Sequence, residues 1–148
     1  MANSKKILYA TDFSKASARA LEEAVRLAKQ NNAEIVVAHV IEHAPYVARD
    51  EFASGEMYAK LEEISKREAQ ASMTKVMQRL KKLKVRAQSL LLRGSAHDQI
   101  VKAAKSKKAG MIVIGTHGRT GLAKLFMGSV AGKVVSSATC PVLTVRGK

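Results

Sequence analysis

The residues best suited to chemistry form a glycine-rich run, GTHGRTGLAKLFMGSV, at positions 115–130, directly behind the apolar run MIVI. Glycine reaches positive φ at no steric cost and lets backbone N–H groups approach an anion closely. Gly128 and Ser129 begin a predicted helix, whose first N–H groups and positive dipole end attract negative charge. The run therefore indicates a phosphate-binding loop. The alternative is a tight turn from a strand into a helix that holds no ligand.

Side chains in and around this run offer few catalytic candidates. His117 lies within the run, but no nearby carboxylate orients it, and no serine or cysteine pairs with it in a known pattern. We therefore predict no catalytic residue. His39, His43 and His97 lack the spacing of a metal site, so no protein-held metal is expected, although Mg²⁺ could accompany bound phosphates.

The elements that must position the run follow from hydrophobic periodicity. Short apolar runs rich in β-branched residues predict strands, and apolar residues that repeat at helical spacing predict helices. Expected strands cover 5–12, 33–42, 85–94, 109–116 and 140–145, and expected helices cover 15–32, 57–83, 96–108 and 128–138. One apolar stripe along the second helix is expected to pack in the core or in a dimer, and it consists of Met57, Leu61, Ile64, Met73, Val76, Met77, Leu80 and Leu83.

Strands that alternate with helices predict an α/β fold, with a parallel sheet between two helix layers. We expect one domain, residues 1–148, because there is no internal repeat and no linker. Ligands of such folds bind outside the carboxyl ends of the strands, where the strand order reverses. If the first and fourth strands flank that point, Asp12 faces the glycine-rich run. Asp12 could equally cap the following helix together with Ser14.

Composition excludes several classes of protein. With 148 residues, 47% of them hydrophobic and only two prolines, the chain has the composition of an ordered globular domain. The N-terminus has no basic region followed by a long apolar core, and no window approaches eighteen apolar residues, so we expect neither export nor membrane insertion. A cytoplasmic protein is the resulting expectation. Cys140, the only cysteine, cannot form an internal disulfide.

The net charge of +14 is unevenly distributed. Residues 1–59 hold 7 basic and 8 acidic side chains, residues 60–108 hold 14 and 4, and residues 109–148 hold 5 and none. No carboxylate side chain follows Asp98, so the charged side chains around the glycine-rich run are all positive and favour an anion. The alternative is that the many lysines only form solvated helix faces.

Two familiar phosphate motifs are absent, because the run is neither GxxxxGK[ST] nor GxGxxG. The spacing Gly115-x2-Gly118-x9-Gly128-Ser129 instead resembles the ATP-binding signature of the universal stress protein family. KILYATDFS at the start, AHVIE after the second strand and the closing CPVLTV also resemble landmarks of that family, in the usual order. The resemblance therefore covers almost the whole chain.

This resemblance implies a Rossmann-like, adenine nucleotide α-hydrolase-like fold whose five parallel strands have the order 3-2-1-4-5. It also implies binding of ATP or AMP, and a homodimer paired through the last strand, Val142 to Val145. The residues implied to face adenine are Ala10, Thr11, Asp12 and, through its backbone, Val40. Ala10 departs from some nucleotide-binding relatives, which carry proline at that position, although a backbone contact should survive the change.

The remaining implied contacts lie on the ribose and phosphate side of the ligand. The residues of the glycine-rich run implied to make them are Gly115, His117, Gly118, Arg119, Gly128, Ser129 and Val130. Gly94, in LLRGSAHDQI, matches a further loop at the rim of the family's pocket.

Three functions are compatible with these observations. The leading hypothesis is a small ATP-binding protein that acts in regulation or in the response to stress. A weak ATPase on the same scaffold is the second, but the SGGxDS and HxGH motifs of adenylating relatives and a positioned general base are missing. The third is a basic module that binds nucleic acid or an acidic partner. Three Phe and three Tyr without a stacking motif make specific base reading unexpected.

Overall fold

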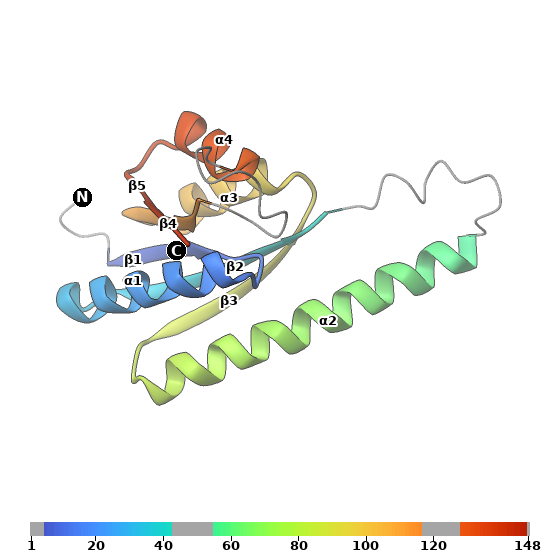
Figure 1. Ribbon diagram of the computed structural model, residues 1–148, viewed down its shortest axis with the longest axis horizontal. Helices are drawn as coiled ribbons and strands as arrows, with labels where there is room; N and C mark the ends of the chain where they lie inside the picture. Colours follow the sequence, from blue (N-terminus) through green and yellow to red (C-terminus); the bar gives the residue numbers. More distant parts are fainter. Residues whose placement is uncertain (1–4, 43–54, 117–127, 148) are drawn as a thin grey trace.

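The structure is a computed structural model that describes residues 5–42, 55–116 and 128–147. Strands and helices alternate along the described chain (Figure 1). The strands are β1 (Lys6–Ala10), β2 (Glu34–Ile41), β3 (Ala87–Arg93), β4 (Met111–Gly115) and β5 (Val142–Val145). The helices are α1 (Lys15–Asn31), α2 (Gly55–Lys82), α3 (Ala96–Ser106) and α4 (Ser129–Ser137). Each lies where the periodicity of the sequence predicts it.

The five strands form one parallel sheet with the order β3-β2-β1-β4-β5, which confirms the predicted topology. The central strand β1 pairs with β2 on one side and with β4 on the other. The chain therefore adds β2 and β3 in one direction and β4 and β5 in the opposite direction. The order reverses between β1 and β4, where a ligand crevice is expected in this class of fold.

Helices cover both faces of the sheet, because alternate residues of each strand point to opposite sides. On β1, Ile7 and Tyr9 pack into the core beneath α1 and α2, whereas Leu8 and Ala10 pack into the core beneath α3 and α4. Burial on both faces explains why the strands read as continuous apolar runs rather than as an alternating pattern. The predicted arrangement of a sheet between two helix layers is confirmed.

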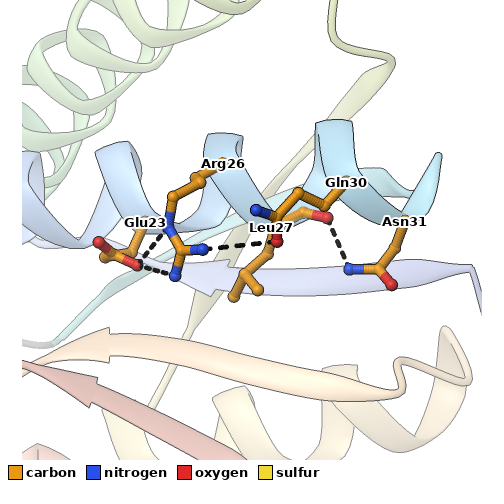
Figure 2. Close-up of polar contacts among 5 residues, drawn as sticks. All are labelled: Glu23, Arg26, Leu27, Gln30 and Asn31. Atoms are coloured by element: carbon orange, nitrogen blue, oxygen red, sulfur yellow. Dashed lines mark hydrogen bonds and ion pairs between the residues drawn. The ribbon is translucent and has the colours of Figure 1, made fainter.

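The outer face of α1 is held by short-range polar contacts (Figure 2). Arg26 donates to Glu23 over 2.6 and 3.1 Å and to the side-chain oxygen of Gln30 over 3.4 Å. Asn31 donates from its amide to the carbonyl oxygen of Leu27, one turn earlier. These contacts join residues three or four positions apart and are exposed, so each contributes only a few tenths of a kcal/mol to the stability of the helix.

The apolar stripe predicted along α2 is only partly confirmed. Met73 and Leu80 are buried, but the exposed fractions of Met57, Leu61 and Ile64 are 51%, 41% and 52%. A helix of 28 residues is about 42 Å long, whereas strands of four to eight residues reach at most about 26 Å. The first half of α2 therefore extends beyond the sheet, as Figure 1 shows.

None of the helices in the described part of the chain combines the length and apolar character needed to cross a bilayer.

Candidate functional site

A cavity of about 840 Å³ opens at the carboxyl ends of β1, β2 and β4. Its wall includes every predicted binding residue that the structure describes except Gly94, namely Ala10, Thr11, Asp12, Val40, Gly115, Gly128, Ser129 and Val130. Asp12 and the end of the glycine-rich run therefore line the same cavity, as expected if β1 and β4 flank the reversal of strand order.

The other predicted residues fall into two groups. His117, Gly118 and Arg119 lie outside the residues that the structure describes. Gly94 is in the turn after β3, with a φ of +126° that favours glycine, and its N–H donates to the carbonyl oxygen of Ile41 over 3.2 Å. Ile41 lines the cavity and Gly94 does not, so Gly94 adjoins a residue of the wall without being part of the wall.

The turn between β1 and α1 is organised by side chains that bond to its own backbone. Asp12 accepts with Oδ1 from the backbone N–H of Ser14 and from the hydroxyl of Ser17, both over 2.9 Å. Ser14 is the true N-cap of α1, because its hydroxyl accepts from the N–H of Ser17. Asp12 thus shapes the turn before the cap, a common role of aspartate, and it also lines the cavity.

Tyr9, on β1, is joined to the start of α1 by a buried hydrogen bond. Its hydroxyl donates to the carbonyl oxygen of Ser17 over 2.6 Å, and the residue is only 1% exposed. Burial, reinforced by the nearby charge of Asp12, raises the pKa of Tyr9 to about 12. The phenol therefore stays neutral at physiological pH and keeps its proton for this bond.

His39 on β2 supports the turn from the side. Its Nδ1 lies 2.7 Å from the carbonyl oxygen of Thr11, and since a carbonyl can only accept, Nδ1 carries the proton. The ring of His39 also packs against the ring of Phe13, with centroids 4.4 Å apart and an interplanar angle of 38°. Phe13 has a φ of +63°, a strained conformation for a residue with a side chain. No local pattern in the sequence predicts these contacts of His39 and Phe13.

The start of α4 forms the opposite wall of the cavity. Gly128 is its N-cap and offers no side chain to bond the first N–H groups. The N–H of Gly128 itself donates to the carbonyl oxygen of Thr116, so the amides left to face the cavity are those of the first turn, beginning with Ser129 and Val130. N–H groups of a first turn have no acceptor within their own helix, which makes them suitable for an anion.

Gly115 lies where packing leaves little room for a side chain. A Cβ at this position would lie 3.1 Å from the carbonyl carbon and oxygen of Ala16, at the start of α1. Gly147 also packs against Ala16, where an added Cβ would lie 2.8 Å from the Ala16 Cβ. Close packing against Ala16 therefore requires glycine at position 115, which also lines the cavity.

The middle of α2 completes the wall with polar side chains that sequence reasoning missed, including Ser65, Glu68 and Ser72. The periodicity of a helix shows which residues share a face, but not which part of that face meets a cavity. Asp12, Glu42 and Glu68 give the wall three carboxylates, whereas no lysine or arginine occurs among its described residues. The acidic side chains and the N–H groups of α4 thus lie in different parts of the wall of one cavity.

Within the described ranges, no three His, Cys, Asp or Glu side chains gather in a way that could hold a metal.

The chain belongs to the universal stress protein family, whose model matches residues 3–146. It is 37% identical over 142 residues to universal stress protein MJ0531 of Methanocaldococcus jannaschii, with 96% of this chain and 82% of the relative covered. Universal stress protein YxiE of Bacillus subtilis is 35% identical over 147 residues, with 95% and 98% covered.

Solved structures show the same fold. MJ0577 of M. jannaschii superposes with a TM-score of 0.85 at 30% identity, covering 97% of this chain and 96% of its own. A family member from Arabidopsis thaliana, solved with AMP bound, has a TM-score of 0.68 at 20% identity, covering 96% and 91%. The universal stress protein of Archaeoglobus fulgidus in complex with dAMP has a TM-score of 0.66 at 23% identity, covering 98% and 99%.

Proposed function

We propose that this universal stress protein binds an adenine nucleotide, ATP or AMP, in the cavity at the carboxyl ends of β1, β2 and β4. The observation that carries the proposal is the shared cavity, whose wall joins the start of α4 to the turn after β1. Its volume of about 840 Å³ lies in the range of small-molecule sites, about 300–1,000 Å³. Family members solved with AMP and dAMP support an adenine nucleotide as the ligand.

The charges of the wall orient the ligand. Phosphates would occupy the side formed by Ser129 and Val130, where first-turn amides and the helix dipole favour negative charge. Adenine and ribose would occupy the side formed by Asp12 and Val40, because carboxylates repel phosphate but accept hydrogen bonds from amino and hydroxyl groups. In the predicted arrangement His117, Gly118 and Arg119 add contacts to ribose and phosphate, and Mg²⁺ could accompany ATP.

We further propose that nucleotide occupancy regulates this protein in a cytoplasmic stress response, with the whole chain, residues 1–148, acting as one domain. A homodimer paired through β5 completes the proposal. β5 is the last strand in the sheet order and pairs only with β4 among the described strands. An edge strand offers backbone N–H and C=O groups to a second chain.

Isothermal titration with ATP, AMP and GTP tests nucleotide binding directly. We expect heat with the adenine nucleotides, and no heat at millimolar ATP and AMP would overturn the proposal. Ser129→Glu places a carboxylate where phosphate is proposed and should abolish binding, while a carboxylate in the first turn stabilises a helix. Ser136→Glu, on the same helix outside the cavity wall, should leave affinity unchanged.

A further inference from the structure

The end of the domain opposite the cavity, where the strands begin, is rich in basic residues. The end of α2 with the turn into β3, residues 81–86, reads KKLKVR, and the end of α3 with the turn toward β4, residues 105–108, reads KSKK. We call these two turns together the basic end. Lys81, Lys82, Lys84 and Arg86 are all exposed.

Hydrogen bonds show that the basic end is continuous along the edge of the sheet. The carbonyl oxygen of Arg86 accepts from the N–H of Ile35, and its guanidinium donates to the carbonyl oxygen of Asn32 over 2.8 Å. Further along the edge, the carbonyl oxygens of Lys5 and Lys6 accept from the N–H groups of Glu34 and Gly110. The starts of β3, β2, β1 and β4 therefore lie side by side.

Acidic side chains that could neutralise this end are scarce. The sequence has no Asp or Glu between Glu68 and Asp98, and none after Asp98. For Lys81, Lys82, Lys84 and Arg86, no ion pair is found within the described residues, whereas Arg93 pairs with Glu62 and Lys102 pairs with Asp98. Glu34, at the start of β2, accepts a hydrogen bond from the side-chain amide of Gln88.

Two lysines of the basic end occupy unfavourable backbone conformations. Lys84 has a φ of +60° and Lys108 a φ of +56°, in the left-handed region where glycine is the usual residue after a helix. Attraction to the negative end of a helix dipole accounts for basic residues within the last turn, such as Lys82 and Lys105. The helix dipole does not account for Lys84 and Lys108, because glycine at these two positions would cause less backbone strain.

The two turns lead into β3 and β4, which are separated by β2 and β1 in the sheet. Three strand spacings of about 4.8 Å place the starts of these two strands about 14 Å apart along the sheet. The major groove of B-DNA is about 12 Å wide. The two turns contain none of the large exposed hydrophobic side chains of the described residues, which are Met57, Leu61, Ile64 and Val135. Neither bases nor lipid tails therefore find an apolar contact there.

We propose that the basic end binds the sugar–phosphate backbones of a nucleic acid duplex, independently of base sequence, with one turn on each side of a groove. Contacts of this kind release counterions, so the logarithm of the binding constant falls linearly with the logarithm of salt concentration. This surface is separate from the nucleotide cavity and does not depend on it.

Fluorescence anisotropy with a labelled DNA duplex of about 20 base pairs tests the proposal on the full chain between about 50 and 200 mM salt. The triple variant K82Q/K84Q/R86Q should weaken binding at least about tenfold at low salt and reduce the salt slope by about two to three. A matched control, K60Q/K66Q/R67Q, removes the same charges from the first half of α2 and should change affinity less than about threefold. Equal losses in the two variants would overturn the proposal, because they would indicate only an effect of net charge.

Two further results separate the proposal from its alternatives. K84G/K108G should raise Tm by a few degrees, because glycine relieves the positive φ, and should also weaken duplex binding. Strain relief without loss of binding would contradict a role for these lysines. Binding to phosphatidylserine vesicles in the absence of any duplex binding would identify a membrane surface instead and overturn the proposal.

Discussion

The hydroxyl of Tyr9 and the carbonyl oxygen of Ser17 lie 2.6 Å apart and join the central strand of the sheet to the first turn of α1. Ser17 also exchanges hydrogen bonds with Asp12, through the Asp12 N–H and carboxylate. The turn that lines the cavity is thus connected to the buried core through one serine.

Replacing Tyr9 with phenylalanine should destabilise the fold by about 1 kcal/mol, the net value of a typical hydrogen bond, because the ring stays in place while the donor is lost. Chemical denaturation measures the change. Tyr58→Phe is a suitable control, since no hydrogen bond of its hydroxyl is found within the described residues. Equal stabilities of the Tyr9→Phe variant and the natural chain would show that the bond contributes nothing.

The pKa of Tyr9 predicts how stability depends on alkaline pH. Burial raises this pKa from 10.0 to about 12 in the folded chain, so the unfolded chain ionises first. The contribution is fully present below pH 10 and is lost as the pH rises to about 12, with a total loss of about 2–3 kcal/mol. Free energies of unfolding measured across this interval should fall more steeply for the natural chain than for Tyr9→Phe. Parallel curves would refute the assignment.

Substitutions at two glycines should have opposite effects on stability. Gly115→Ala should destabilise by about 1–3 kcal/mol, because the new methyl group meets the backbone of Ala16 at 3.1 Å. Gly132→Ala should stabilise by up to about 1 kcal/mol, because nothing lies within 4 Å of the added Cβ and alanine favours a helix. Thermal unfolding compares the two variants, and a stabilising effect at position 115 would contradict the close packing of β4 on α1.

Cys140 should react slowly with alkylating reagents. Burial raises the pKa of its thiol, so less of the reactive thiolate is present near neutral pH. Iodoacetamide should label the folded chain more slowly than the chain unfolded in urea, and the rate should increase as the pH rises. Labelling at the same rate in both states would argue against the burial of this thiol.

Periodicity and the alternation of elements were sufficient to predict the α/β class and the position of every described element, while the strand order came from the resemblance to the family. The meeting of Asp12 with the end of the glycine-rich run was also predictable, because both follow strands that flank the reversal of order. The contacts of Tyr9 and His39 were not predictable, since they join β1, α1 and β2 across distances that no local pattern encodes. The exposure of the first half of α2 was not predictable for a similar reason, because the stripe indicates a face but not where the sheet beneath it ends.

The hydrogen bond between Thr116 and Gly128 brings the end of β4 to the start of α4, although residues 117–127 separate the two in the chain. The exit and the return of the polypeptide therefore lie next to each other on the framework formed by β4 and α4. Any change of sequence between Thr116 and Gly128 that preserves this bond leaves the strand and the helix joined at the same point, so the interval and the framework can evolve separately.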